Sequence, residues 1–341
     1  MESTSSSRLQ QFTGGAINIP SAISFHSSPP IHATNISQEQ RHNLSTTSSL
    51  PSPRSVDLIS TPSFTMPYPT NEVTVTYQDR VAIITLNRPS KLNALTAVHY
   101  YLLGQKMREV AARDDIYITV LTGNGRFFSA GADVVRSFSE ESDNIDGRRD
   151  VVQGFVANNI DLTHTFYTHP KILVVALNGP AVGFSAALTA FGDFIYATPH
   201  SYILTPFSSI GLVTEGASSH AFVRRMGIAK AKEALIMSKR ISSKELLQTG
   251  FVNKIFTSPS GKEDDSDGFL KMVLHEIDMT LGTHLNQDSL LKIKALIGAP
   301  DRDVLDRQNV REVFGGLERF ELGIPQAEFM KIASGQKRHK L

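Results

Sequence analysis

The sequence predicts an α/β protein, and three observations support this class. Segments with strand-like alternation and segments with helical periodicity follow each other between residues 72 and 256. Two of the strands, at 116–121 and 172–177, are almost wholly apolar, as in parallel sheets that are covered on both faces. Beyond about residue 260 the periodicity is helical only. We therefore expect an α/β core with right-handed crossovers, followed by a C-terminal helical subdomain.

The order of the predicted elements follows from these patterns. A hairpin occupies residues 73–86 around the polar turn Gln78-Asp79-Arg80, with Val73, Val75 and Tyr77 alternating before the turn and the apolar stretch Val81–Leu86 after it. The patterns then predict helices at about 96–113 and 151–168, a polar loop around 137–146, and a helix that begins near 184. In the C-terminal region they predict helices at about 268–281, 289–297 and 304–330.

Length, charge and composition limit the functional class. A chain of 341 residues with 40% hydrophobic content can fill a sizeable core. Its 34 Lys and Arg nearly balance its 33 Asp and Glu, which argues against a nucleic-acid or membrane-surface binder. The absence of cysteine excludes disulfides, a thiolate nucleophile and Cys-ligated metals. No apolar run approaches the roughly 18 residues of a membrane span, so we expect a soluble protein.

Residues 1–65 differ in composition from the rest of the chain. Ser, Thr and Pro account for 29 of these 65 residues, and lysine is absent. Such a segment buries too little apolar surface to offset its ordering entropy, so we expect a disordered extension. A transit peptide is an alternative interpretation, although no amphipathic Arg-rich helix is present. Translation from Met66, just before the folded pattern, is another.

Several motifs exclude common chemistries. Walker A and dinucleotide-binding glycine motifs are absent, and the 11 histidines show no metal-ligand spacing, so we expect no metal site. The run Gly183-Phe184-Ser185-Ala186-Ala187 resembles the start of a nucleophile elbow but has alanine where the second glycine belongs. We therefore interpret Ser185 as structural.

Three segments carry a stronger functional signal. Small residues and a glycine in Arg126–Asp133, after a buried strand, let the backbone approach a ligand closely. The segment Asn178–Leu188 contains a glycine turn and a helix start, whose free N–H groups suit a developing oxyanion. In Ile210–Gly216 a single acid, Glu215, lies among apolar residues. Taken singly, these are also typical of a tight loop, a strand–helix connection and a first-turn acid.

Together the three segments resemble the crotonase (enoyl-CoA hydratase/isomerase) superfamily. The stretch Leu86–Leu95, with its Asn87-Arg88-Pro89 opening, and Phe251-Val252 as a strand after an Ala/Leu-rich helix support the resemblance, which covers residues 72–256 well. It implies a spiral of ββα units in residues 66–260, with residues 261–341 as a helical trimerisation region. It also implies acyl-CoA thioesters as substrates, no cofactor beyond the CoA of the substrate, and homotrimers or homohexamers.

The resemblance assigns roles to individual residues. The backbone N–H groups of Ala132 and Phe184 would form the oxyanion hole for the thioester carbonyl. Residues that would hold the CoA moiety are Lys91, Leu92, Ala130, Gly131, Ala132, Asp133 and Val134. A solvated surface charge is an alternative interpretation of Lys91.

Departures from the family pattern select the reaction. The two glutamates of the hydratases are replaced here by Ala187 and Phe207, and the further acids of the dienoyl-CoA isomerases are missing as well. The remaining acid, Glu215, resembles the lone glutamate of fungal peroxisomal Δ3,Δ2-enoyl-CoA isomerases. One carboxylate suffices for a 1,3-proton shift from C2 to C4, and its apolar neighbours should raise its pKa. Alternatives are another crotonase-fold isomerase or hydrolase that uses Glu215, and a non-catalytic acyl-CoA-binding partner.

The last three residues, His339, Lys340 and Leu341, resemble the Ser-Lys-Leu peroxisomal address. They predict recognition by a peroxisomal import receptor and a peroxisomal location. A solvated basic tail is the alternative.

Overall fold

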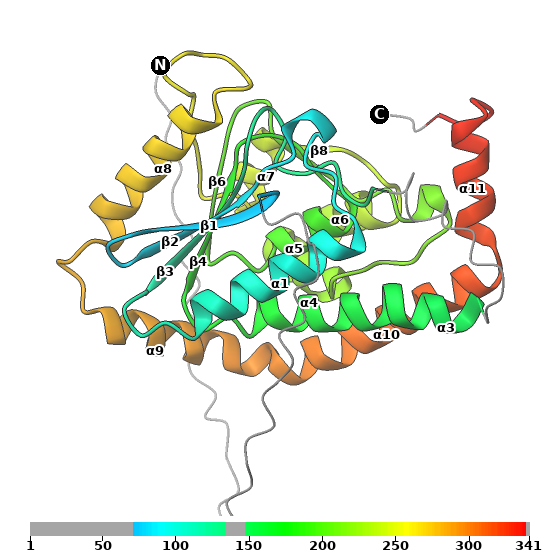
Figure 1. Ribbon diagram of the computed structural model, residues 1–341, viewed down its shortest axis with the longest axis horizontal. Coiled ribbons are helices and arrows are strands. Elements are labelled where there is room, and N and C mark those ends of the chain that lie inside the picture. Colours follow the sequence, from blue (N-terminus) through cyan, green and yellow to red (C-terminus); the bar gives the residue numbers. More distant parts are fainter. Residues whose placement is uncertain (1–70, 134–146, 339–341) are drawn as a thin grey trace, which may run out of the picture. The chain divides into compact units, whose positions relative to one another are not determined.

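A six-stranded sheet forms the centre of the structure (Figure 1). The computed structural model describes residues 71–133 and 147–338, which belong to one compact unit. The strand order is β1-β2-β3-β4-β6-β9; β1 and β2 are antiparallel and the other neighbours are parallel. The strands are β1 Val73–Gln78, β2 Val81–Leu86, β3 Ile118–Gly123, β4 Ile172–Leu177, β6 Phe194–Ala197 and β9 Lys254–Ile255.

A smaller sheet extends the core toward the functional loops. It has the order β5-β7-β8, in which β5 Ala181–Val182 is parallel to β7 Tyr202–Leu204 and β7 is antiparallel to β8 Ile241–Ser242. Helices connect most of the strands. The predicted α/β class is therefore confirmed within the described residues.

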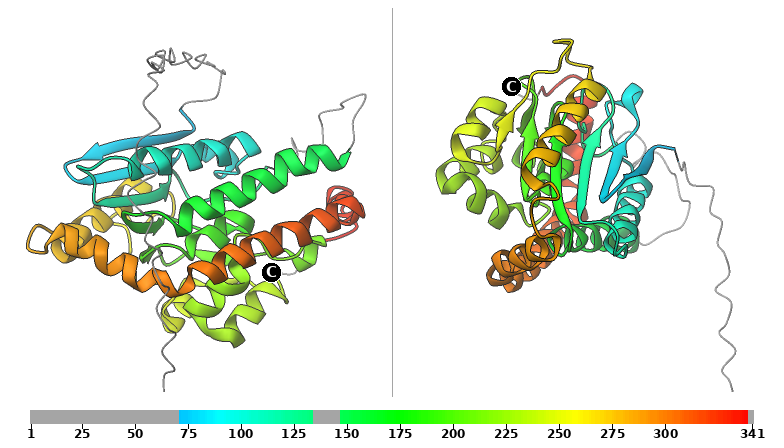
Figure 2. Two further views of the ribbon diagram at one scale, coloured as in Figure 1. Left: turned by 90° about the horizontal axis from the view of Figure 1, so that it is seen from below. Right: turned by 90° about the vertical axis from the view of Figure 1, so that its left-hand side faces the viewer.

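Helices cover both faces of the large sheet. Those between the strands are α1 Ala97–Ala111, α3 Gly147–Val151, α4 Ala157–Tyr167, α5 Gly183–Thr189, α6 Ser218–Leu235 and α7 Ser243–Thr249. Those after the last strand are α8 Ser266–Leu281, α9 Gln287–Gly298, α10 Arg302–Glu321 and α11 Ile324–Ala333. Short 3-10 helices lie at Pro89–Lys91, Ser208–Ile210 and Ala299–Asp301. The two views in Figure 2 show α10 beside α4, along its length.

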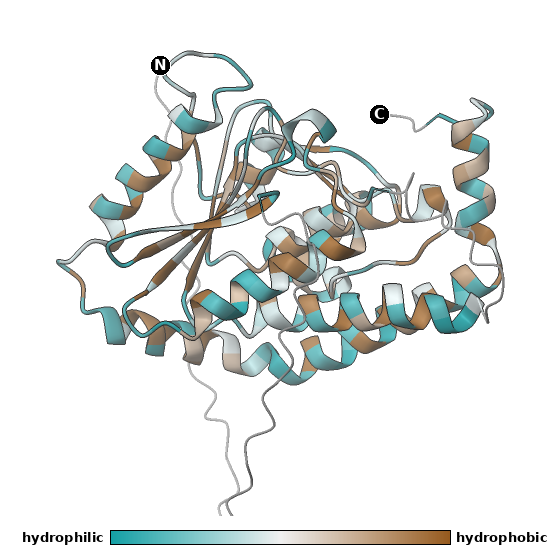
Figure 3. Ribbon diagram, viewed as in Figure 1, coloured by the Kyte–Doolittle hydropathy of each residue, from teal (hydrophilic) through white to brown (hydrophobic). Residues whose placement is uncertain are grey.

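Alternating strand residues divide the core into two clusters. Ile84, Leu121 and Val175 pack with residues of α1, α4 and α6, whereas their neighbours Ile83, Val120 and Val174 pack with α8. Because successive side chains of a strand point to opposite faces, both faces of the sheet are buried. Figure 3 shows the result as largely hydrophobic strands between helices of mixed character.

The predicted hairpin and the strand Ile172–Leu177 are confirmed, but three other expectations need correction. The helix predicted at 304–330 is two helices, α10 and α11, because Gly323 has φ +67° and Pro325 opens the second helix. The helix predicted at 151–168 begins at Gly147 and contains a π-helical turn, Val152–Val156. The strand predicted at Phe251-Val252 lies at Lys254–Ile255. Phe251 and Val252 are buried, but the Val252 N–H donates to the Leu246 carbonyl of α7 instead of to a neighbouring strand.

Three predictions lie outside the described residues. They concern the extension at 1–65, the polar loop around 137–146 and the last three residues. The boundary between a core at 66–260 and a helical region at 261–341 stays a prediction. Within the described ranges, no helix is long and apolar enough to cross a membrane.

Candidate active site

The loops before α1 and before α5 meet around Gly131. Isolated parallel bridges join Leu95 to Ala132 and Ser129 to Ala181. Gly131 has φ +88°, and a Cβ atom added to it would lie 2.9 Å from the carbonyl oxygen of Val182. Both observations require glycine at this position. The structure therefore brings two of the three predicted functional segments into direct contact.

The amide of Ala132 points away from its bridge partner. The N–H of Leu95 donates to the carbonyl of Gly131 (2.8 Å), and the N–H of Asp133 donates to the carbonyl of Leu95 (2.9 Å). These two bonds flank Ala132 and leave its own N–H on the opposite side, where the residue is exposed. Within the described residues, this amide has no acceptor.

Phe184 supplies a second free amide. It is the second residue of α5, and amides in the first turn of a helix have no acceptor within the helix. The N-cap residue, Val182, provides no side-chain cap, and no loop or turn hydrogen bond from the Phe184 N–H is present among the described parts of the chain. The two amides assigned by the resemblance are thus free, on segments that touch.

The residues predicted to hold CoA also lie together. The N–H of Ala130 donates to the carbonyl of Leu92 (2.9 Å), which places the Lys91-Leu92 turn beside the loop 130–133. Leu92 has φ +52° and ends the 3-10 helix, and the Lys91 side chain is exposed. Val134 lies outside the described residues.

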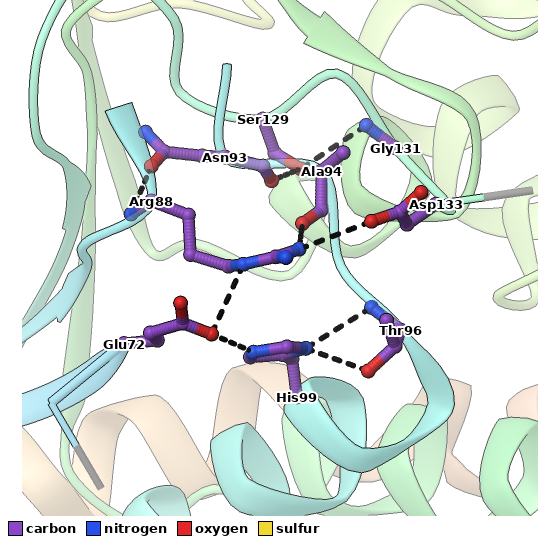
Figure 4. A network of polar contacts seen from close by, with 9 residues as sticks. All are labelled: Glu72, Arg88, Asn93, Ala94, Thr96, His99, Ser129, Gly131 and Asp133. Atoms are coloured by element: carbon purple, nitrogen blue, oxygen red, sulfur yellow. Dashed lines mark hydrogen bonds and ion pairs between the residues drawn. The ribbon is translucent and has the colours of Figure 1, made fainter. Parts of the chain in front are cut away.

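A network of polar contacts holds the end of the loop 130–133 (Figure 4). The buried guanidinium of Arg88 bonds to the carbonyl of Ala94 and forms ion pairs with Asp133 (3.4 Å) and Glu72 (3.1 Å). The Nε2 of His99 lies 2.5 Å from the Glu72 carboxylate. The network ties the start of β1 to the residue that follows Ala132, so it limits movement of that amide.

His99 is held in one tautomer by the same network. Its Nδ1 accepts from the backbone N–H of Thr96 (3.2 Å), so this nitrogen carries no hydrogen. The Nε2 therefore carries the hydrogen and donates it to Glu72. Sequence reasoning left His99 without a role, because the interaction joins residues on separate elements.

Glu215 lies on a loop that packs against α5. A Cβ atom added at the following residue, Gly216, would lie 2.9 Å from Cβ of Ala187 and 3.3 Å from the Phe184 ring. The third predicted segment therefore packs against the second, which in turn contacts the first at Gly131. Glu215 itself is 7% exposed, and its Oε2 accepts from Nδ2 of Asn159 at 3.2 Å.

Burial raises the pKa of Glu215 to about 8. The hydrogen bond from Asn159 opposes this shift, and the negative charge of Glu312 adds to it. The raised pKa expected from the apolar neighbours is thus present, with burial as its main cause. A carboxyl that titrates near neutrality is suited to take up and return a proton.

Glu312 is a second buried acid that sequence reasoning missed. It lies on α10, is 6% exposed, and its Oε1 accepts the N–H of Ser219 (2.8 Å) in the first turn of α6. Burial raises its pKa as well. Because α6 begins directly after the loop of Glu215, Glu312 connects the C-terminal helix to that loop.

A sequence signal for Asn159 and Glu312 existed. Asn159 follows Phe155 by four residues and precedes Leu162 by three, so it belongs to the inward stripe of its helix. Glu312 lies in the same way on the buried stripe of α10, three residues after Asn309. A polar residue on a buried stripe needs a partner, and here the partners are Glu215 for Asn159 and the Ser219 N–H for Glu312.

The positions expected to carry glutamates in hydratases hold no acid. Ala187 is fully buried against the loop of Glu215, and Phe207 is 2% exposed. Neither side chain can orient a water molecule. No group of three or more potential metal ligands occurs in the described part of the chain.

Two free amides beside a buried, proton-accepting carboxyl define a site that can enolise a carbonyl compound. The family comparison identifies the kind of protein that carries such a site. Residues 76–264 match the family model described as enoyl-CoA hydratase/isomerase. The chain therefore belongs to this family and has the crotonase fold.

A solved structure and three curated relatives agree with this assignment. The chain resembles an enoyl-CoA hydratase/isomerase from Pseudoalteromonas atlantica, with a TM-score of 0.67 and 25% identity over 79% of this chain and 100% of that one. It is 58% identical to a Delta(3,5)-Delta(2,4)-dienoyl-CoA isomerase of Pyricularia oryzae, over 79% of this chain and 98% of the relative. It is 32% identical to a 3,2-trans-enoyl-CoA isomerase of Saccharomyces cerevisiae, over 76% and 93%. A mouse protein named enoyl-CoA delta isomerase 3, peroxisomal, is 28% identical over 76% of each chain.

Proposed function

We propose that the protein is a Δ3,Δ2-enoyl-CoA isomerase of fatty-acid β-oxidation, which converts 3-enoyl-CoA (cis or trans) into trans-2-enoyl-CoA. The observation that carries the proposal is Glu215: one buried carboxyl with a pKa raised to about 8, on a loop packed against the helix start that holds one of two free amides. The family supports double-bond isomerisation, and the number of available acids supports the 1,3-shift.

The geometry supports a mechanism with one base. The N–H groups of Ala132 and Phe184 would donate to the thioester oxygen, which polarises the carbonyl and acidifies the C2 protons. Glu215 would take a proton from C2, and the resulting dienolate would carry its negative charge on the oxygen between the two amides. The protonated carboxyl would then return the proton at C4, which leaves the double bond between C2 and C3. C2 and C4 are separated by a single carbon, so one carboxyl can serve both.

A second candidate is a Δ3,5-to-Δ2,4 dienoyl-CoA isomerase. The relative with 58% identity bears that name. This reaction removes a proton from C2 and adds one at C6. Three carbons separate these two positions. Glu312 is a further buried acid: its Oε1 accepts the N–H of Ser219, while its Oε2 has no hydrogen-bond partner among the described residues. We favour the Δ3,Δ2 reaction because the acids that the resemblance assigns to dienoyl-CoA isomerases are missing at the regions of Ala187 and Phe207.

The deciding experiment compares the two substrates. Purified protein is given 3-enoyl-CoA of several chain lengths, and 2-enoyl-CoA is followed through a coupled hydratase and dehydrogenase. In parallel, 3,5-dienoyl-CoA is given and the conjugated product is followed by its ultraviolet absorbance. We expect a higher kcat/KM for 3-enoyl-CoA; a higher value for the dienoyl substrate would establish the second candidate instead.

The Glu215→Gln variant is the matched control. It preserves size and hydrogen-bonding capacity but cannot accept the proton, so kcat should fall about 100- to 10,000-fold while acyl-CoA binding persists. Turnover at the wild-type rate would reject Glu215 as the base. Acyl-CoA binding by the wild type without turnover of either substrate would instead favour a binding-only protein.

We further propose a peroxisomal location, because the chain ends in His339-Lys340-Leu341 and a mouse relative is named peroxisomal. The import receptor would recognise these three residues. A fluorescent protein fused to the N-terminus should form puncta that coincide with a peroxisomal marker, and removal of the last three residues should disperse it. Puncta that persist after the truncation would exclude the ending as the address.

A further inference from the structure

Three buried hydroxyl groups form a hydrogen-bonded series next to the two segments that carry the free amides. The Tyr100 hydroxyl lies 3.0 Å from Oγ of Ser185, and this Oγ lies 2.9 Å from Oγ of Ser129. Ser129 also donates to the carbonyl of Asn93 at 2.8 Å. The three residues are 7%, 4% and 0% exposed in that order, so water does not satisfy these groups.

The hydrogens of this series run in one direction. The Asn93 carbonyl can only accept, so the single hydroxyl hydrogen of Ser129 is used there. The hydrogen between the two serines must then come from Ser185, and the Tyr100 hydroxyl donates to Ser185. Burial raises the pKa of Tyr100, and the charge of Glu215 raises it further, so the phenol keeps its proton. Each of the two serine hydroxyls thus both donates and accepts, and the Tyr100 hydroxyl donates at the end of the series.

The series connects the two peptide segments that carry the free amides. The N–H of Gly131 donates to Oγ of Ser129 at 3.1 Å, and Gly131 directly precedes Ala132. Ser185 directly follows Phe184. The bond between the two serines therefore joins one donor segment to the other through side chains, in addition to the backbone contact at Gly131.

Tyr100 also supports the second segment through its ring. Its ring meets that of Phe184 edge to face, with centroids 5.2 Å apart and planes at 61°. The same Phe184 ring contacts the loop of Glu215 at Gly216. Tyr100 thus packs against the start of α5, which also contacts the loop of Glu215.

We propose that Tyr100, Ser185 and Ser129 are positioning residues, which fix the separation and direction of the two amides toward the thioester oxygen. The inference rests on the proposed role of these amides. Ser185 does not serve as a nucleophile, because its buried Oγ is used in two hydrogen bonds. Stabilisation of an oxyanion depends on donors preset at hydrogen-bond distance, so a small displacement has a large effect on rate.

The test measures carbonyl polarisation directly. A saturated acyl-CoA with carbon-13 at the thioester carbonyl is bound to the enzyme, and isotope-edited infrared spectroscopy records the carbonyl stretch. Hydrogen bonds from the two amides should lower this frequency relative to the free thioester. The measurement needs no turnover, so a polarised carbonyl without isomerisation would reject the proposed reaction and leave this inference intact.

Three variants separate positioning from general stability. Ser185→Ala breaks the link between the segments, and Tyr100→Phe removes only the terminal hydroxyl. Ser243→Ala is the control. Ser243, the first residue of α7, is equally buried (4% exposed) and donates to the Pro199 carbonyl between β6 and β7, apart from these contacts. We expect Ser185→Ala to lose part of the frequency shift and about 10- to 100-fold in kcat, with KM changed less than about threefold. Tyr100→Phe should show a smaller loss of both, and Ser243→Ala should retain both.

Contrary results are clear. A folded Ser185→Ala or Tyr100→Phe variant with the full frequency shift would overturn the proposal. Equal loss in Ser243→Ala would also overturn it, since the effect would then reflect general destabilisation. The absence of any shift in the wild type would show that the amides do not polarise the thioester, which removes the basis of the inference.

Discussion

At the scale of single residues, the protonation state of Glu215 controls the proposed chemistry. A carboxyl with a pKa of about 8 is only about one-tenth ionised at pH 7, and a base must be ionised to accept a proton. The raised pKa makes the ionised form a stronger base. Its two polar neighbours act in opposite senses: Asn159 favours the ionised form by donating to it, and Glu312 disfavours it by its charge.

These opposing influences predict opposite changes in pH dependence. For the wild type, kcat/KM should rise about tenfold per pH unit and level off above about pH 8, because ionisation of the free enzyme's base limits it. Asn159→Leu should move the midpoint to higher pH, since the hydrogen bond to the carboxylate is lost. Glu312→Gln should move it to lower pH, since a nearby negative charge is lost while the acceptor for Ser219 remains. Profiles of kcat/KM for the three proteins test this, and coincident midpoints would contradict the assignment of the titration to Glu215.

At the scale of elements, the site is formed where loops and helix starts touch. Gly131 permits the contact between the two donor segments, and Gly216 permits the contact between the Glu215 loop and α5. The π-helical turn Val152–Val156 precedes α4 and changes the helical register just before Asn159. The sequence predicted the helix but not this turn, because apolar periodicity does not distinguish one widened turn from regular helix.

The contact at Gly131 predicts a large effect of one methyl group. Gly131→Ala should lower kcat about 100-fold, because the new Cβ would lie 2.9 Å from the Val182 oxygen and must displace the Ala132 amide. Gly250→Ala is a matched control with φ +80° and open space around it, at the end of α7. Both variants should lose about 1–3 kcal/mol of stability from the positive φ, measured by thermal unfolding. Similar kcat values for the two variants would argue against a role for the Gly131 contact in the site.

At the scale of the whole molecule, the C-terminal helices both complete the site and carry an apolar surface. α10 brings Glu312 to the start of α6, and its Arg319 donates to the Gly211 carbonyl (2.8 Å) below the Glu215 loop. On α9 none of the residues is buried, and the exposed apolar side chains are Ile293, Leu296 and Ile297, with exposed fractions of 54%, 74% and 70%. Apolar side chains grouped in this way on an exposed helix are typical of an interface.

The predicted homotrimer or homohexamer would cover this face with further copies of the chain. Analytical ultracentrifugation at micromolar concentration should give the mass of three or six chains. Leu296→Glu should shift the distribution to smaller species, because a charge would be buried in the interface without a partner. Lys292→Glu, an exposed residue of the same helix, should leave it unchanged. A monomeric wild type would refute the expected assembly.

Local patterns in the sequence determined much of this protein. The strand-like pattern in residues 73–86 and the apolar run 172–177 predicted the fold class. The three candidate segments, with Glu215 as the remaining acid, predicted which residue is the proposed base. These features depend on neighbours along the chain, because strand alternation, glycine turns and helix starts are local properties.

Only the tertiary structure decided how the site is supported. Asn159 donates to Glu215 from α4, and Glu312 on α10 accepts from Ser219 in the first turn of α6. Tyr100, Ser185 and Ser129 come from three separate segments. Sequence patterns place such residues on the inward side of an element but do not select their partners. The partners are set by how helices and loops pack, because a buried polar group must find its hydrogen bond wherever packing places one.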